Sequence, residues 1–261
     1  MNAFDVLIVG ARCAGASLAI LLGQLGYRVC LIDRATFPSD TLSTHVFGDW
    51  AAFGRLGVTE AIRASGAPPI TRFRVDINGI VLEAPIVVTP WVSGLRRIKL
   101  DQILLDKVRQ YPTVDWRPGC ELVSLVYEGN RVTGAVVRRG RRIEQIDAAV
   151  VVGADGRHSL TARLTCAPAY LSFSPPRCAY YAYLEGFTPL PVPTFEFHWR
   201  GENLILTFPT DEDMQCVVVL PPQSEFSVWR KAPQVHFEAA IASDTALAPR
   251  MRGVRRIHAV R

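Results

Sequence analysis

The chain has 261 residues, of which 49% are hydrophobic and 20% are charged, so it is too apolar for a disordered protein and long enough for two packed domains. It lacks an apolar run of the roughly 20 residues that span a bilayer, and its six cysteines lack the C-x-x-C spacing of a zinc site, which favours a soluble protein in a reducing cytoplasm without a metal centre. The net charge of +5 comes from 29 basic and 24 acidic residues, and five arginines fall in the last twelve positions, so the body of the chain lacks the basic stripe that binds nucleic acid.

A strand, a helix and a second strand are predicted in succession at the N-terminus. Asp5–Gly10 is a short apolar run rich in β-branched residues, which is typical of a strand buried on both faces of a parallel sheet. Apolar residues then recur at helical spacing from Ala14 to Leu25, and Gly26 offers a C-terminal stop. Because Arg28–Asp33 is again a buried strand, the pattern predicts a βαβ unit.

The stretch up to residue 165 mixes hairpins with helices. The dipeptide Asn78-Gly79 between two apolar alternations is a strong hairpin signal, and Glu128-Gly129-Asn130 joins a second pair of strands. The predicted elements are weak helical patches near 48–65, strands at 70–77 and 80–88, an amphipathic helix at 100–108, strands at 122–127 and 131–138, and a buried strand at 148–152.

From about residue 166 the pattern changes to alternating strands separated by prolines. These strands are predicted at 178–184, 194–199, 204–208 and 216–220. We therefore expect an α/β fold with a mostly parallel sheet over residues 1–165, into which a hairpin near 70–90 is inserted, and a lobe with an antiparallel β-sheet over residues 166–261.

The turn after the first strand carries a dinucleotide-binding fingerprint. Gly10 allows the tight turn, the helix N-terminus presents N–H groups to a pyrophosphate, Gly15 lets helix and strand pack closely, and Asp33 can accept from a ribose hydroxyl. Arg12 replaces the second glycine of the motif. An ordinary buried βα turn is therefore the alternative, although a basic side chain could also add charge to a phosphate site.

Four segments in the same order resemble the flavoprotein (class A) monooxygenase superfamily, whose relatives include para-hydroxybenzoate hydroxylase and the geranylgeranyl reductases. They read DVLIVGARCAGASLAILL, LIDRATFPSDTLSTH, RRIKLDQILLDK and VVGADGRHS. The resemblance implies an FAD-binding, Rossmann-like domain over residues 1–165 and a substrate lobe over residues 166–261.

The same resemblance implies a set of cofactor contacts. In it, the glycine loop meets the pyrophosphate of FAD, Asp33 meets the adenosine ribose, the backbone of Val123 meets adenine, and the Asp155 carboxylate accepts from ribityl or ribose hydroxyls. The implied FAD-binding residues are Gly10, Arg12, Cys13, Ala14, Gly15, Asp33, Arg34, Arg97, Val123, Asp155 and Gly156.

Several of these residues have an alternative interpretation. Arg97 could be a solvated surface arginine, and Asp155-Gly156 could be a plain turn. Cys13 fits simple packing, although a helix N-terminus can lower the pKa of a thiol. His45, the one catalytic candidate, lies in a loop that runs toward the flavin in relatives, and a structural hydrogen-bonding role is the alternative.

Aromatic side chains alternate along two strands of the predicted lobe. Tyr181 and Tyr183 share one face of their strand, and Phe195, Phe197 and Trp199 share one face of the next. They could wall a pocket over the flavin or form the core of a sheet packed on helices.

The reaction that the resemblance implies is an NAD(P)H-dependent hydroxylation of a small organic substrate by oxygen, through a flavin hydroperoxide, with NAD(P)H bound only transiently. Two alternatives stay open: a flavin-dependent reductase of the geranylgeranyl reductase type, and a truncated, non-catalytic flavin-binding fragment. Relatives carry a third, Gly-Asp motif beyond the substrate sheet, whereas Gly48-Asp49 comes too early. We therefore expect a chain that stops before this motif.

Overall fold

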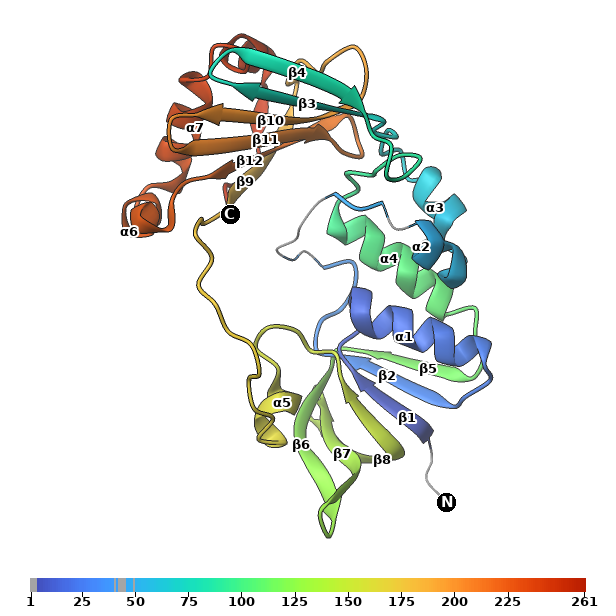
Figure 1. Ribbon diagram of the computed structural model, residues 1–261. Coiled ribbons are helices and arrows are strands. Elements are labelled where there is room, and N and C mark those ends of the chain that lie inside the picture. Colours follow the sequence, from blue (N-terminus) through green and yellow to red (C-terminus); the bar gives the residue numbers. More distant parts are fainter. Residues whose placement is uncertain (1–3, 40, 42–45, 49) are drawn as a thin grey trace. The chain divides into compact units, whose positions relative to one another are not determined.

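The computed structural model of the chain describes residues 4–39, 41, 46–48 and 50–261 (Figure 1). They form two compact units. Unit 1 comprises residues 1–41, 51–62 and 97–171, and unit 2 comprises residues 42–50, 63–96 and 172–261.

Unit 1 is built on a six-stranded sheet in the order β5-β2-β1-β8-β7-β6 (Figure 1). Strands β5, β2, β1 and β8 run parallel, whereas β7 and β6 continue the sheet as antiparallel neighbours. The strands are β1 (Phe4–Val9), β2 (Val29–Asp33), β5 (Val114–Pro118), β6 (Cys120–Glu128), β7 (Arg131–Arg139) and β8 (Arg142–Gly153). The helices are α1 (Cys13–Gln24), α2 (Trp50–Leu56), α3 (Thr59–Arg63), α4 (Arg97–Val108) and α5 (Leu160–Leu164), of which α2 and α3 each extend to a residue of unit 2. The mostly parallel sheet predicted from the sequence is confirmed.

Helix α1 covers this sheet with small residues, which lets its backbone approach closely. Its buried positions are Gly15, Ala16, Ala19, Ile20 and Gly23. The helix ends where predicted, because Gly26 takes a left-handed φ of +79° that an L side chain adopts only with strain. The βαβ unit is therefore as expected, and α1 also packs against α4.

Unit 2 is a seven-stranded sheet in the order β13-β9-β12-β11-β10-β3-β4. Its strands are β3 (Arg72–Ile77), β4 (Ile80–Pro85), β9 (Tyr180–Glu185), β10 (Thr194–Arg200), β11 (Asn203–Pro209), β12 (Met214–Leu220) and β13 (Arg256–Ile257). Helix α7 (Pro233–Ala242) packs on one face through Phe237, Ala240 and Ile241, which share a core with Ala182 and Val217. The remaining helical segments are η1 (Gln223–Glu225), α6 (Phe226–Trp229) and η2 (Ala248–Gly253).

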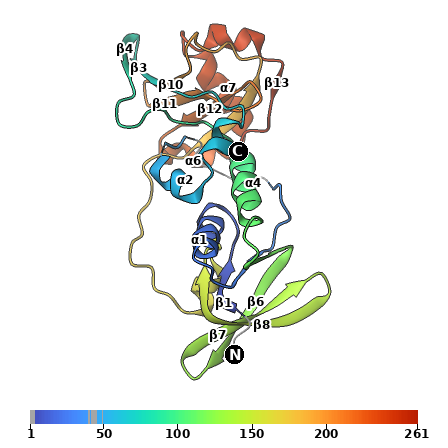
Figure 2. The same cartoon turned by 90° about the vertical axis from the view of Figure 1, so that its right-hand side faces the viewer.

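The predicted hairpin at Asn78-Gly79 is present, but it lies in the sheet of unit 2 and is not inserted in the first domain. Both turn residues have positive φ, +50° and +93°, as a two-residue hairpin turn requires. Strand β3 lies beside β10 in this sheet (Figure 2) and pairs with it in parallel. In this register Phe73 is the partner of Phe195. This parallel pairing is the one exception to the antiparallel order expected for that sheet. Because of it, residues 63–96 belong to unit 2 together with residues 172–261, and the two units are not divided at residues 165–166.

No helix among the described residues is both long enough and apolar enough to cross a membrane.

A cluster of buried charged side chains lies on the face of β10 that carries Glu196, His198 and Arg200. His198 is fully buried, with its Nδ1 3.3 Å from the Asp244 carboxylate and its Nε2 3.3 Å from the Glu196 carboxylate. The other ion pairs of the cluster join Arg200 to Asp76 at 2.8 Å, Arg200 to Asp244 at 3.1 Å and Arg250 to Glu196 at 2.7 Å. Each buried charge thus faces an opposite charge, as burial in a low dielectric requires.

These carboxylates favour the charged form of His198. Burial by itself lowers the pKa of His198, but hydrogen bonding and charge attraction from Asp244 and Glu196 outweigh it, and the net shift is upward from 6.5. A raised pKa in the folded state stabilises the fold fully below the unfolded value of about 6.5. That stabilisation is lost as the pH rises through the folded pKa.

We therefore expect the free energy of unfolding of unit 2 to fall as the pH rises above 6.5, by up to about 1.4 kcal/mol per pH unit. His198→Gln should remove this slope, whereas the half-buried His236, when changed to Gln, should leave it unchanged. Urea unfolding between pH 6 and 9 measures the slope. An identical slope in wild type and His198→Gln would contradict this assignment.

Candidate functional site

Two glycines fix the close packing where β1 passes into α1. Gly10 has a φ of +101°, and a Cβ added there would lie 2.4 Å from the carbonyl oxygen of Ala154, just beyond β8. A Cβ at Gly15 would lie 1.7 Å from the carbonyl oxygen of Gly10. The start of α1 therefore lies directly against the carboxyl ends of β1 and β8, and only glycine fits at these two positions.

This place is the switch point of the parallel sheet. The chain adds β2 and β5 on one side of β1, and it later adds β8, β7 and β6 on the other side, so the order of the strands reverses at β1. Ligands of open α/β sheets bind in the crevice that such a reversal opens at the carboxyl ends of the strands. The topology thus marks the loop from Gly10 to Gly15 as a binding site.

The first turn of α1 is suited to an anion. Within the described part of the chain, no side chain caps the helix at Arg12, and its first turn contains no acidic residue. The N–H groups of an uncapped helix start, together with the positive end of the helix dipole, attract phosphate. The residues present therefore fit a dinucleotide pyrophosphate.

Asp33 closes the loop from the end of β2. Its Oδ2 accepts the backbone N–H of Ala11 at 2.8 Å, and its Oδ1 accepts that of Ala35 at 2.8 Å. Each carboxylate oxygen has a second acceptor position, so Asp33 can hold the loop and still accept from a ribose hydroxyl. Arg34, next to it, is exposed.

Arg12 and Arg97 meet at one carboxylate, that of Asp101. Arg12 Nη1 lies 2.7 Å from Asp101 Oδ2, and Arg97 Nη2 lies 2.9 Å from Asp101 Oδ1. Arg97 is thus a partly buried, ion-paired residue of α4 and not a solvated surface arginine. Its neighbour Arg96 belongs to unit 2, where it pairs with Asp211.

Cys13 packs in the first turn of α1 and points at the same carboxylate. Its Sγ lies 3.5 Å from Asp101 Oδ1. Burial, assisted by the Asp101 charge, raises the pKa of the thiol from 9.0 to about 11, against the attraction of Arg97. The packing interpretation therefore holds, and the helix N-terminus does not activate this cysteine.

We expect Cys13 to react slowly with iodoacetamide at neutral pH, because this rise in pKa lowers its thiolate fraction about a hundredfold. Cys166, which is exposed and follows α5, should be alkylated first. Peptide mass spectrometry over a time course measures both sites, and Cys166→Ser should leave a chain that reacts slowly. Equal alkylation rates at Cys13 and Cys166 would disprove this view of Cys13.

The Asp155 carboxylate organises the turn that follows β8. It accepts the hydroxyl of Ser159 at 2.6 Å and the backbone N–H of Thr161 at 3.0 Å, while Ser159 caps α5. Burial raises the pKa of Asp155, but these hydrogen bonds outweigh it and the net shift is downward. Gly156 follows with a φ of +80°, so the pair forms a constrained turn in which Asp155 stays ionised.

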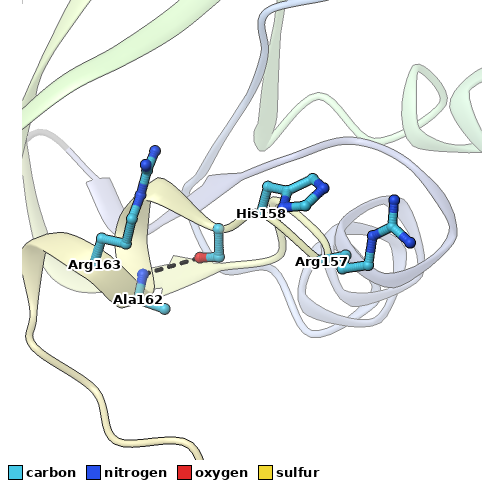
Figure 3. Close-up of a pocket in the computed structure, with 5 residues that line it drawn as sticks. Arg157, His158, Ala162 and Arg163 are labelled. Carbon is cyan, nitrogen blue, oxygen red and sulfur yellow. Dashed lines mark hydrogen bonds between the residues drawn. The ribbon is translucent and has the colours of Figure 1, made fainter. Parts of the chain in front are cut away.

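A pocket of about 290 Å³ opens beside this turn. Its lining residues are Arg157, His158, Ser159, Ala162 and Arg163. Figure 3 shows the side chains of Arg157, His158 and Arg163 near the hydrogen bond that joins Ser159 to Ala162. Its two arginines give the pocket a positive charge.

Val123 lies on β6 at a β-bulge. The register of β6 and β7 passes from Leu122 to Ser124 without it, so the backbone of Val123 has no ladder partner on β7. The contact with adenine that the resemblance implies for this backbone stays a prediction. Ala14 is exposed at the start of α1, and His45 lies outside the described residues.

The five aromatic side chains predicted to alternate do share one face of the sheet of unit 2. Tyr181 is buried in a core with Phe208 and Val218, whereas 41% of Trp199 is exposed. The core interpretation is therefore confirmed for Tyr181, while the face becomes more open toward β3 and β4.

In unit 1 the ends of β1, β2 and β8 thus lie near the start of α4. Two further residues of this site, Asp101 and Ser39, were not predicted from the sequence. A signal for Asp101 was present. It shares a helical face with Leu104, Leu105 and Val108, all buried, and a carboxylate on an apolar face indicates a buried ion pair.

Comparison with known proteins agrees with this geometry. Residues 3–171, more than half of the chain, match the family described as the FAD binding domain. Over 172 residues, 63% of its length, the chain is 32% identical to 6-methylpretetramide 4-monooxygenase from Streptomyces rimosus. Over 175 residues, 61% of its length, it is 25% identical to digeranylgeranylglycerophospholipid reductase 2 from Methanothermobacter thermautotrophicus.

Among solved structures, all of the chain superimposes on the myxobacterial chondrochloren halogenase CndH, an FAD-dependent enzyme, with a TM-score of 0.85 and 18% identity. That likeness shows the fold. The chain spans 41% of the length of the monooxygenase, 41% of the reductase and 64% of the halogenase structure.

Proposed function

Because the chain belongs to the family of FAD-binding domains, we propose that it holds FAD with the pyrophosphate against the first turn of α1 and uses it for an oxidation–reduction reaction. One observation carries the proposal. The uncapped start of α1 lies at the switch point of the sheet, where the end of β8 approaches Gly10 so closely that only glycine fits.

The other site residues would then have distinct tasks. Asp33 would accept from the adenosine ribose, the backbone of Val123 at the bulge would meet adenine, and the turn that Asp155 organises would meet the ribityl side. Arg34, exposed beside Asp33, would lie near the adenosine end, and Ala14 and Gly15 would offer backbone N–H groups. Bound FAD would supply the redox chemistry, and these residues would orient it.

We propose hydroxylation of a small organic substrate as the reaction, with NAD(P)H as the reductant. The 32% identity with a monooxygenase over 172 residues favours this reaction. Each turnover would consume one O₂, one NAD(P)H and a proton, place one oxygen atom in the product as a hydroxyl group and release the other as water. A reductase is the second candidate, because the chain is also similar to a digeranylgeranylglycerophospholipid reductase.

Labelled oxygen distinguishes the two reactions. The purified chain is loaded with FAD and supplied with NADPH or NADH under ¹⁸O₂, with a panel of phenols and with geranylgeraniol as probes. Hydroxylation predicts oxygen uptake that rises with a phenol and a product that carries one ¹⁸O atom. Reduction predicts that geranylgeraniol gains two hydrogens per NAD(P)H without labelled oxygen.

The third interpretation, a non-catalytic fragment, has its own signature. A colourless chain that added FAD does not stabilise against heat would support it and overturn the proposed function.

A further inference from the structure

A single buried carboxylate joins the glycine loop to α4. Asp101, in the second turn of α4, is completely buried. Its Oδ1 accepts two hydrogen bonds from Arg97, one from Nε at 3.2 Å and one from Nη2 at 2.9 Å. Its Oδ2 receives Nη1 of Arg12 at 2.7 Å. Arg12 stands at the position of the second glycine of the fingerprint, so this contact lies within the cofactor loop.

The guanidinium of Arg12 is held on the side of α4 and of the loop after β2. Besides Asp101, Ser39 accepts from it through the hydroxyl, at 2.9 Å, and the carbonyl oxygen, at 3.3 Å. The ring of Phe37 lies 5.3 Å from its central carbon. A long side chain at a position that usually needs glycine is thereby drawn away from its own backbone.

Two guanidinium groups share the Asp101 carboxylate beside the uncapped start of α1. A pyrophosphate can reach the N–H groups of that helix start only where these arginine side chains do not occupy the place of the phosphates.

We propose that Asp101 is a positioning residue of the cofactor site. It holds the Arg12 guanidinium toward α4, so that the first turn of α1 stays open to the pyrophosphate although the second glycine is missing. This inference rests on the proposed function, since it presupposes FAD at α1. It also explains why an arginine is tolerated there: Asp101 and Ser39 give its guanidinium another place.

The test is a cycle of variants in which the FAD dissociation constant is measured by quenching of flavin fluorescence. Asp101→Asn should weaken FAD binding at least tenfold, because the released arginine can cover the N–H groups of α1. Arg12→Gly should bind FAD within threefold of wild type. Adding Arg12→Gly to Asp101→Asn should restore binding to within threefold of wild type, since the obstructing side chain is then absent.

Asp106→Asn is the matched control. Asp106 lies on the same helix but is exposed, and it pairs with Arg109 at the surface, so its loss should leave FAD binding unchanged. Thermal unfolding is recorded for every variant, because a purely structural carboxylate would change stability without rescue of FAD binding by Arg12→Gly.

Three results would overturn the inference while the proposed function stands. These are wild-type affinity in Asp101→Asn, a double variant as weak as Asp101→Asn, and tenfold weaker binding in Arg12→Gly. If Asp101→Asn does not fold, the FAD affinity of Arg12→Gly is compared with that of the double variant. In the double variant only one guanidinium group, that of Arg97, still faces position 101. Equal FAD affinity in those two supports the inference, and a tenfold gap refutes it. A wild-type chain that does not bind FAD overturns both proposals.

Discussion

Gly15→Ala should greatly weaken FAD binding and destabilise unit 1 more than any other single methyl group added to the site. The new Cβ would lie 1.7 Å from the carbonyl oxygen of Gly10 and 3.2 Å from Cγ2 of Ile8. Backbone cannot yield as a flexible side chain does, so α1 must move away from β1. We expect a loss of about 3 kcal/mol in the free energy of unfolding, at the upper end for an overpacked core. FAD affinity should fall at least about a hundredfold, since the N–H groups of the first turn move with the helix.

Gly54→Ala is the matched control for this variant. Gly54 lies in α2, and a Cβ added there meets nothing within 4 Å. Alanine should therefore leave FAD binding unchanged and stabilise the helix by up to about 1 kcal/mol. Urea unfolding and flavin titration measure both variants, and wild-type FAD affinity in Gly15→Ala would show that the close packing of α1 on β1 is not needed.

Asp211→Asn should lower the stability of unit 2 by about 3 to 5 kcal/mol, the usual effect of breaking a buried ion pair. Asp211 is fully buried and accepts three hydrogen bonds from Arg96: from its backbone N–H at 3.0 Å, from Nε at 2.9 Å and from Nη2 at 2.6 Å. Burial lowers the pKa of Arg96, but the hydrogen bonds and charges of Asp211 and Glu212 outweigh it and raise the pKa. Arginine stays ionised in proteins, so the guanidinium remains charged after Asp211→Asn and loses the carboxylate that balances it.

The neighbouring Glu212 offers a control on the same arginine. It pairs with Arg96 at 2.6 Å, but 57% of its side chain is exposed. Exposed ion pairs contribute about 0 to 1 kcal/mol, so Glu212→Gln should have little effect. Chemical denaturation followed by tryptophan fluorescence compares the two variants. Similar losses in both would mean that the burial of Asp211 does not determine the effect.

Local patterns in the sequence were sufficient to predict much of the fold. The apolar run of β1, the helical spacing of α1 and the turn at Asn78-Gly79 each act over a few residues, and all three formed as expected. The sheet to which β3 belongs could not be predicted in this way, because its parallel pairing with β10 joins segments far apart in the chain. Helix α7 was not predicted for a similar reason. It has only a few buried residues, and it is stabilised by packing on a sheet whose strands come from other parts of the chain.

The candidate site shows the same division. The glycine loop and Asp33 follow a spacing that the sequence displays directly, so their meeting could be predicted. The partners of Arg12 could not, because Asp101 and Ser39 come from different elements and only the folded chain brings them to one guanidinium. Asp155 illustrates a role that spacing does not reveal, since its carboxylate holds the turn before α5.

A titration of the wild-type chain with FAD, and in parallel with riboflavin, tests the central claim most directly. Riboflavin has the same ring system and ribityl chain but lacks the pyrophosphate and the adenosine, which we place at the start of α1 and at Asp33. We predict that FAD binds at least about a hundredfold more tightly than riboflavin, a difference of about 2.7 kcal/mol, because only FAD can reach the N–H groups of α1 with phosphates and Asp33 with a ribose. Equal affinity for the two flavins, or no binding of FAD, would contradict the account.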